Sequence, residues 1–420
     1  MINRRKFTVD WGANLFSLGL LATTGIALNS LIVRFYGPDV LGVFNQVYAI
    51  YILGSQIATF GIQFSILKYV AEFSEDLEAV SLSVGAAVLS VATCAILTIF
   101  LIFAFFRYSS LQPYSAGVAY GVTYVLPGLW FFAINKVLLN ALNGRQANTI
   151  YAFFAGLRYL LIVLFFLVAI KLRVSGEQLP GILSASEASL SLAMAFAYRK
   201  IFPGGFTLGN QDWVKRHLHF GLRSIFGGLA VELNTRVDVL ILGIFTNDYD
   251  IGIYSFAAFF VEGLSQLSVI TRRLIDPMLT KLTIPGNHDA LRQLLIRGRN
   301  IGAVGMAACG AASIALYPWY ATWFGGANVA SASWGIFVIL TIGASFFVVY
   351  GAFAGVFSQS GAPLKQTWLS IVILVTNLGL NFALVPWWGI WGAAVATSLS
   401  FAVGTFYLRV LVYRHLGIRF

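Results

Sequence analysis

The chain contains an internal repeat at an offset of 210 residues, which is half of its length of 420. Four residues of the first copy reappear in the second without a gap: Phe35, Gly42, Ser55 and Gln56 correspond to Phe245, Gly252, Ser265 and Gln266. Both copies lie in hydrophobic segments long enough to cross a membrane. A repeat inside a helical membrane protein is typical of transporters whose substrate path runs between the copies. The first hypothesis is therefore a duplicated membrane unit.

Composition places the chain in a lipid bilayer. Hydrophobic residues make up 59% and charged residues 10% of the chain, whereas about a quarter of the residues of a soluble protein are charged. The formal net charge of +11 is explained by cytoplasmic loops that orient the helices, and no basic motif with interleaved aromatic residues indicates a nucleic-acid partner. Cys94 and Cys309 both fall inside hydrophobic segments and are expected to be buried free thiols.

Twelve stretches are long and apolar enough to cross a membrane as helices. Their approximate limits are 11–35, 40–70, 79–106, 117–141, 147–170, 180–199, 219–245, 251–274, 299–324, 333–357, 366–386 and 390–413. The sixth is the weakest, because four serines and Glu187 dilute it. A polar connection over 200–218 is the predicted cytoplasmic linker between an N-terminal six-helix bundle, 1–199, and a C-terminal one, 219–420. The fold class is all-α, with two parallel-repeat bundles.

Basic residues predict the orientation of the helices. Most of the 27 Lys and Arg residues lie on one side of the membrane if the N-terminus is cytoplasmic. The positive-inside rule then places both termini in the cytoplasm, which agrees with an even number of spans. Residues 1–10 are read as leading into a retained first helix and not as a signal peptide. Residues 285–298 are read as an amphipathic interfacial helix, with a solvated cytoplasmic loop as the alternative.

Motifs of soluble enzymes are missing from the sequence. There is no phosphate-binding loop, no Cys/His metal spacing and no dinucleotide fingerprint, and all four histidines lie at predicted cytoplasmic loops or ends. We therefore expect no enzymatic activity, no cofactor and no metal. Direct use of ATP by this chain is not expected, so transport is driven by an ion gradient or is uncoupled.

Polar residues form a stripe on the second span. Asn45, Gln56 and Gln63 are eleven and seven residues apart, which places them on one helix face at about 100° per residue. The repeat-equivalent positions in the eighth span, Ser255, Gln266 and Arg273, are also polar. Two equivalent stripes could line a path between the two copies, because polar side chains in a bilayer avoid lipid. The alternative is that the glutamines bridge helices within each bundle.

Ionisable residues inside the predicted spans are functional candidates, because each costs about 2.5 to 3.5 kcal/mol at a helix centre. These candidates are Arg158, Glu187, Glu232, Arg236, Asp238 and Glu262. Internal ion pairs are the alternative reading: Glu232 with Arg236, four residues apart on one face, and Arg158 with Glu187. Lys136, Arg272 and Arg273 lie nearer the predicted cytoplasmic ends, where snorkelling to the headgroups is the alternative to a role in the path.

Several short motifs resemble a known family. The segment LNTRVDVLILGIF, followed from Gly252 by GIYSFAAFF, resembles the seventh and eighth helices of polysaccharide exporters in the multidrug/oligosaccharidyl-lipid/polysaccharide exporter superfamily. Matches elsewhere are Tyr36, Gly37, Pro38, Leu41 and Gly42 in the first loop, Pro277 after the eighth helix, and Asn377, Asn381, Pro386, Gly389, Gly392 and Thr397 near the end. The resemblance covers nearly the whole chain in layout.

This resemblance implies two six-helix bundles around a cavity that opens alternately to either side. It further implies that the substrate is a polyprenyl-diphosphate-linked sugar unit of lipopolysaccharide, capsule or exopolysaccharide, moved across the cell inner membrane. Lipid II flippases of the superfamily usually carry more spans, which argues against that branch. Polysaccharide polymerase and glycosyltransferases are candidate partners, besides the lipid-linked oligosaccharide and membrane lipid.

The sequence therefore predicts a flippase for lipid-linked oligosaccharide that works by alternating access. Arginine suits a diphosphate because its planar fork donates two hydrogen bonds to phosphate oxygens. The predicted substrate-binding residues are Arg158, Arg236, Arg272, Arg273, Asn45, Gln56, Gln63 and Gln266, and the predicted ion-coupling residues are Glu232 and Glu262. The alternatives are a multidrug exporter of the same fold, with an acidic cavity for cationic drugs, and a membrane scaffold protein that does not transport.

Overall fold

The computed structural model describes residues 23–110, 112–201, 210–283 and 288–419, and in these ranges it contains helices and no strands. This confirms the predicted all-α class. Residues 1–10, the first part of the first span (11–22), part of the linker (202–209) and the start of the predicted interfacial helix (285–287) lie outside the described residues.

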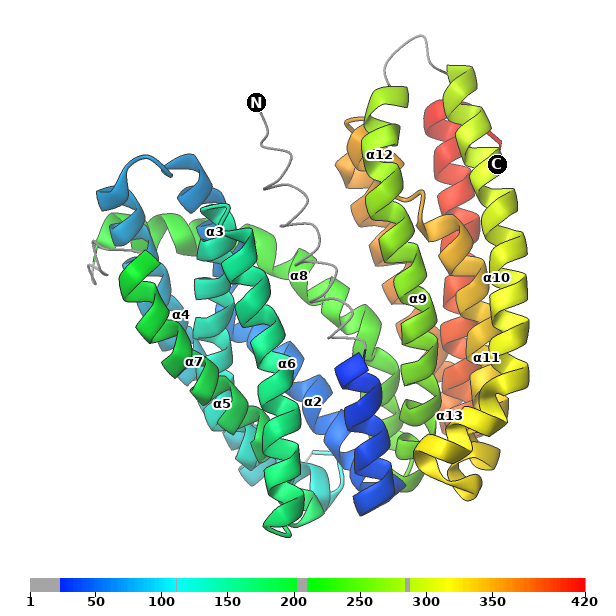
Figure 1. Ribbon diagram of the computed structural model, residues 1–420, viewed down its shortest axis with the longest axis horizontal. Helices are drawn as coiled ribbons and strands as arrows, with labels where there is room; N and C mark the ends of the chain where they lie inside the picture. The colour runs from blue at the N-terminus through cyan, green and yellow to red at the C-terminus, as the bar shows by residue number, and fades with distance from the viewer. Residues whose placement is uncertain (1–22, 111, 202–209, 284–287, 420) are drawn as a thin grey trace. The chain divides into compact units, whose positions relative to one another are not determined.

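The helices follow the predicted spans closely (Figure 1). Residues 23–36 are helical, and after them come α2 (Pro38–Thr59), α3 (Ile62–Glu72), α4 (Leu77–Tyr108), α5 (Ala116–Gly144), α6 (Asn148–Lys171), α7 (Gly181–Ile201), α8 (Gln211–Phe245), α9 (Asp248–Leu282), α10 (His288–Gly325), α11 (Ala327–Gly351), α12 (Val356–Gln359) and α13 (Pro363–Leu416). Within the described residues, nine helical segments are long and apolar enough to cross a membrane. The predicted seventh span lies on α8, which is not among these nine.

Three predicted spans differ from the expectation in their continuity. The predicted second span is interrupted between α2 and α3, where Phe60 and Gly61 take positive φ angles of 48° and 72°. The last two predicted spans are joined in α13, which kinks at Gly389 with φ 52° and ψ −130°. A positive φ costs glycine little, so this residue allows the kink without a connecting loop.

Contacts divide the chain into two compact units. Unit 1 comprises residues 1–28 and 43–232, and unit 2 comprises residues 29–42 and 233–420. Helix α2 is therefore shared between the units at Gly42, and α8 is shared at Glu232. The predicted division into bundles at the linker remains a prediction.

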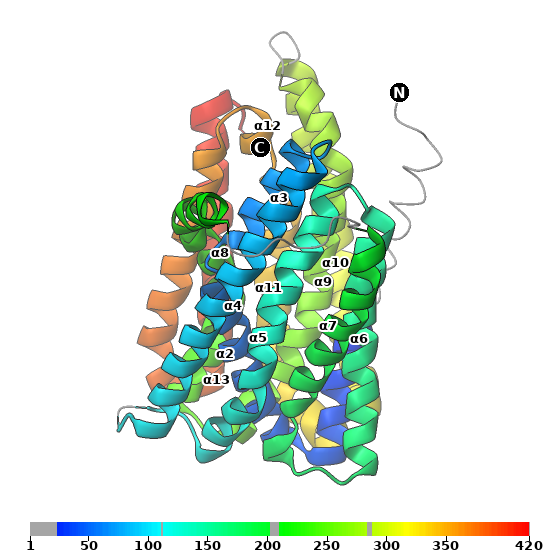
Figure 2. The ribbon, with the colours of Figure 1, turned by 90° about the vertical axis from the view of Figure 1, so that its left-hand side faces the viewer.

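In unit 1, α5 is the central helix. It packs against α3, α4, α6 and α7, and the helices lie side by side in both ribbon views (Figures 1 and 2). A core of small aliphatic side chains, including Val84, Val91, Ala133 and Val137, fills the space between them. Helices approach most closely at small residues in membrane proteins. Gly128 of α5 is such a place, because a Cβ atom there would lie 2.6 Å from the Cα of Ser184 on α7.

In unit 2, α11 takes the central place and packs against α9, α10 and α13. Gly343 of α11 allows the close approach of α13, since a Cβ atom there would lie 2.5 Å from the Cα of Ser398. The first turns of α10 correspond to the predicted interfacial helix. Leu291 and Leu295 are buried there in a core with Phe353 of the same unit, while Arg292 is exposed. The amphipathic pattern was read correctly, but its apolar face packs on protein.

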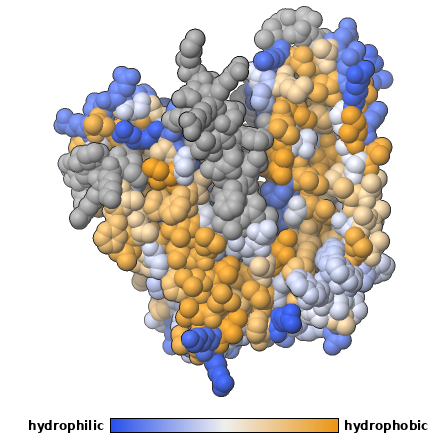
Figure 3. Space-filling view, viewed as in Figure 1, coloured by the Kyte–Doolittle hydropathy of each residue, from blue (hydrophilic) through white to orange (hydrophobic). Residues whose placement is uncertain are grey.

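The outer surface of the helices is apolar (Figure 3). Hydrophobic residues cover the flanks and hydrophilic residues gather toward the helix ends. Large exposed side chains include Phe100, Leu101, Phe153 and Ile301, as expected for helices that contact lipid. Both cysteines are free, as predicted, but Cys309 is exposed on α10 and Cys94 is half-buried, so the expectation that both are buried is wrong.

The first turns of α8 are anchored on α3 and α4 by His217. This residue precedes the predicted seventh span and is fully buried. Its Nε2 lies 3.0 Å from the Ser83 carbonyl oxygen and so carries the proton, while Nδ1 accepts a hydrogen bond from the Ser65 hydroxyl at 2.6 Å. The rings of Tyr69 and Trp213 lie 5.5 and 6.0 Å from the imidazole. The second half of the predicted linker is therefore a helix that is continuous with the following span.

This anchor predicts a loss of stability in acid. Burial lowers the pKa of His217 to about 4, although the hydrogen bond to Ser83 opposes the shift. A histidine in the unfolded chain has a pKa near 6.5. The neutral imidazole therefore contributes fully to the free energy of unfolding above about pH 6.5, and this contribution is lost as the pH falls toward 4. The contribution amounts to about 3 kcal/mol. The thermal melting temperature of the purified protein should fall over this range.

His217→Gln should lower the melting temperature at neutral pH and remove this part of the pH dependence. The matched control is His219→Gln, because His219 lies on the same helix and is exposed. If His217→Gln left the acid-induced loss between pH 6.5 and 4 unchanged, His217 would not be its cause.

Candidate functional site

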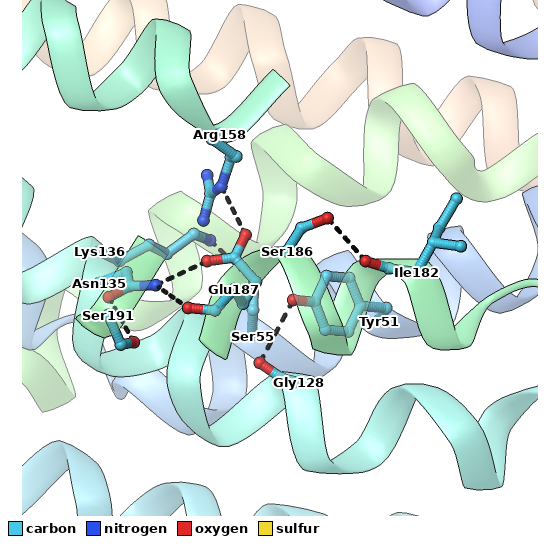
Figure 4. A network of polar contacts seen from close by, with 10 residues as sticks. All are labelled: Tyr51, Ser55, Gly128, Asn135, Lys136, Arg158, Ile182, Ser186, Glu187 and Ser191. Carbon is cyan, nitrogen blue, oxygen red and sulfur yellow. Dashed lines mark hydrogen bonds and ion pairs between the residues drawn. The ribbon is translucent and has the colours of Figure 1, made fainter. Parts of the chain in front are cut away.

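A buried ion pair lies at the centre of the candidate site in unit 1. Nε of Arg158 on α6 lies 2.5 Å from Oε1 of Glu187 on α7, and the two side chains are only 15% and 4% exposed (Figure 4). The alternative reading, in which these two residues pair with each other, is thus confirmed. The Arg158 guanidinium also lies over the Phe132 ring, 4.0 Å from its centroid. Burial of two charges is tolerated here because they are paired and hydrogen-bonded.

Asn135 of α5 fixes the other side of the Glu187 carboxylate. Its Nδ2 donates to Oε2 of Glu187 at 2.8 Å and to the Glu187 carbonyl oxygen at 3.0 Å. The Ser191 hydroxyl in turn donates to Oδ1 of Asn135 at 2.8 Å. Glu187 and Ser191, two of the polar residues that make the predicted sixth span weak, thus attach α7 to α5. Ser184 contributes likewise, since its Oγ accepts from the Gly128 N–H at 2.9 Å.

Lys136 completes the site, although it is not among the predicted substrate-binding residues. Its Nζ donates to the hydroxyl of the buried Ser55 at 2.8 Å, and it lies 4.6 Å from the centroid of the Phe132 ring. Lys136 and Arg158 therefore share one aromatic ring, and the snorkelling alternative is wrong for Lys136. Its place directly after Asn135, inside an apolar 29-residue helix, was the available signal.

The cations of this cluster keep unused hydrogen-bond donors. Nη2 of Arg158 is buried and has no hydrogen-bond partner among the described residues. Lys136 carries three N–H donors, of which one is directed at Ser55. Two carboxylates, those of Glu187 and Glu232, act electrostatically on Lys136, and both already accept hydrogen bonds from other side chains. The cluster therefore presents cationic N–H donors, the kind of group to which an anion binds.

Part of the polar stripe connects to Glu232. Nε2 of Gln63 donates to Oε1 of Gln56 at 2.7 Å, and Nε2 of Gln56 donates to Oε1 of Glu232 on α8 at 2.9 Å. Both glutamines are buried. Gln56 thus links α2 to α8, whereas the alternative reading placed the bridges within one predicted bundle, so the role of the stripe remains a prediction. Asn45 is half-buried on α2.

The remaining predicted site residues lie in unit 2. Nε of Arg272 lies 3.5 Å from Oδ2 of Asp276, one turn further along α9. Gln266 is half-buried and Glu262 is exposed on the same helix, and the side chain of Arg273 lies outside the described residues. Arg236 is half-buried on α8 and acts electrostatically on Asp238. Its predicted pairing with Glu232 remains a prediction.

A second network in unit 2 joins residues from the short motifs. The Tyr254 hydroxyl donates to Asp238, and a further hydrogen bond links Tyr254 to Thr397. Thr397 and Asn381 both donate to Oδ1 of Asn377, at 3.5 and 2.8 Å. This network attaches α8, α9 and α13 to one another, so motifs that are far apart in the sequence meet in one place.

An all-helical membrane fold with charged residues buried in its interior is a common arrangement in membrane transporters. The structure is similar to a solved structure described as the lipid II flippase MurJ in an inward closed conformation, with a TM-score of 0.75 and 15% identity over 96% of this chain and 87% of that one. It is also similar to an inward-facing multidrug resistance MATE family transporter of the MOP superfamily, with a TM-score of 0.72 and 14% identity over 98% of both chains.

The chain belongs to the polysaccharide biosynthesis protein family, whose model matches residues 12–283. A probable flippase, AglR of Haloferax volcanii, is 27% identical over 184 residues. That match covers 40% of this chain and 36% of the relative, so it spans only about a third of that protein's length. The predicted family and fold are thus confirmed.

Proposed function

We propose that this protein is a flippase that moves a polyprenyl-diphosphate-linked oligosaccharide across the cell inner membrane by alternating access. The observation that carries the proposal is the pair of cations around Phe132, whose unused donors match the acceptor oxygens of a diphosphate. Hydrogen bonds from cations to phosphate are strong in a medium of low dielectric constant. Membership of the polysaccharide biosynthesis family supports the same substrate class.

The other predicted residues have supporting roles in this proposal. Arg236, Arg272 and Arg273 add positive charge along the path, and Asn45, Gln56, Gln63 and Gln266 bind the sugar. Glu232 and Glu262 couple transport to an ion gradient. Residues 1–199 and 219–420 form equivalent bundles about an axis along the membrane normal, with both termini cytoplasmic. Glycosyltransferases and a polymerase supply and consume the substrate, and the protein itself catalyses no reaction.

The experiment is a flipping assay in proteoliposomes with a fluorescent polyprenyl-diphosphate sugar and an impermeant quencher. Lys136→Ala should slow flipping by about 10- to 100-fold, because a charge-assisted hydrogen bond contributes about 1.5 to 3 kcal/mol. Lys136→Arg should retain part of the activity. The matched control is Lys68→Ala, since Lys68 is exposed and its 3.9 Å surface pair with Glu72 contributes little.

Four outcomes would contradict the proposal or its parts. Transport of a cationic dye in place of the lipid would favour the multidrug exporter, and transport of neither would favour the scaffold. Wild-type flipping by Lys136→Ala would remove Lys136 from the site. If the Glu232→Gln and Glu262→Gln variants respond to collapse of the proton gradient as the wild type does, these two carboxylates do not couple transport to the gradient.

A further inference from the structure

Two glycines of the repeat contact each other's helices in unit 2. A Cβ atom at Gly42 on α2 would lie 1.9 Å from the carbonyl oxygen of Asp248, at the start of α9. A Cβ atom at Gly252 on α9 would lie 1.9 Å from the carbonyl oxygen of Pro38, at the start of α2. Real Cβ atoms essentially never approach another atom this closely, and a backbone carbonyl cannot rotate away as a side chain can. Both positions therefore require glycine in this conformation.

The contact is reciprocal under the repeat. Gly42 corresponds to Gly252 and Pro38 to Asp248 at the same offset, so each helix presents its glycine to the equivalent carbonyl of the other. Such an exchange is the pattern of an isologous contact about a two-fold axis. Glycine contacts of this kind bring membrane helices close together and allow Cα–H···O interactions.

This symmetry has a consequence for a transport path. Two equivalent points that touch each other must lie on either side of the axis that relates them, and in a parallel duplication the path follows that axis. Backbone atoms in van der Waals contact leave no room for a substrate there. Helix α2 passes from unit 2 to unit 1 directly after Gly42.

We propose that the crossing of Gly42 and Gly252 is a conformational lock that blocks the path at the N-terminal ends of α2 and α9. It opens when the protein takes the opposite-facing conformation. By the predicted orientation this end is extracytoplasmic. The inference rests on the proposed function only in that the protein is an alternating-access transporter, and it does not depend on the substrate.

The lock can be tested by distance measurements between two spin labels. Phe35 and Phe245 are equivalent under the repeat, lie in unit 2 and are 56% and 45% exposed, so cysteines at these positions are suitable label sites after Cys94→Ala and Cys309→Ala. The wild-type glycine background in nanodiscs should give a short and a longer distance. Gly42→Ala and Gly252→Ala should each make the longer distance the more populated one. The double variant should shift the distribution little further, because the two single variants break the same contact.

The matched control is Gly263→Ala, since Gly263 lies on α9 and its Cβ atom would have no heavy atom within 4 Å. This variant should keep the wild-type distribution. An unchanged distribution in folded Gly42→Ala or Gly252→Ala protein, or a shift in only one of them, would overturn the lock. If neither variant folds, a single short distance in the wild-type background would overturn it. The measurement needs no substrate, so failure of the flipping assay would not affect its result.

Discussion

Glu187→Gln is expected to destabilise the protein by about 3 to 5 kcal/mol, because it leaves the Arg158 guanidinium buried without its counterion. Glutamine keeps the shape of the side chain and still accepts a hydrogen bond from Asn135, so the loss of stability measures the effect of removing the negative charge. Lys136, beside the same Phe132 ring, adds to the uncompensated positive charge. The measurement is the thermal melting temperature of the purified protein, together with its level in the membrane.

The double variant Arg158→Gln/Glu187→Gln separates a structural from a transport role. It removes both charges, so most of the lost stability should return, but flipping should remain impaired because a cationic donor is missing. Glu72→Gln is the control, since the exposed pair of Glu72 with Lys68 contributes little. Full flipping by the folded double variant would show that the pair is purely structural.

Gly128→Val is expected to prevent α5 and α7 from packing. The new Cβ atom would lie 2.6 Å from the Cα and 3.0 Å from the N atom of Ser184, and these backbone atoms cannot move without displacing α7. Overpacking costs about 1 to 3 kcal/mol, and the lost hydrogen bond between Gly128 and Ser184 adds about 1 kcal/mol. Since α7 carries Glu187, flipping should be lost together with the melting transition.

The control for this prediction is Gly263→Val, at a position with open space around the Cβ atom. Its melting temperature should stay near that of the wild type. A normal melting temperature for Gly128→Val would mean that α7 can shift without loss of packing, and the close approach of the two helices would then not be required.

The helices were predictable because hydropathy is a local property. A bilayer demands about 20 apolar residues and internal backbone hydrogen bonds, so each span can be recognised in its own segment. The sixth span shows where this criterion weakens. Ser184, Glu187 and Ser191 lower its hydropathy, and only the structure shows that they are hydrogen-bonded to α5.

The candidate site was predictable in part. Arg158 and Glu187 were paired because a buried charge requires an opposite charge and few carboxylates were available. Lys136 was missed because distance along a helix does not reveal whether a long side chain turns to the headgroups or inward. The direction of Gln56 toward Glu232, 176 residues away, likewise depends on how α2 and α8 pack.

The sequence by itself determined the membrane class, the helix positions, the repeat and the family resemblance, since each is written in the order and hydropathy of neighbouring residues. Only the tertiary structure decided which polar groups meet. It brought Lys136 to the Phe132 ring, joined Asp238 and Tyr254 of the motifs to Thr397, and placed the repeated Gly42 and Gly252 against each other's helices. These contacts depend on the packing of helices that are distant in the chain, which local periodicity does not encode.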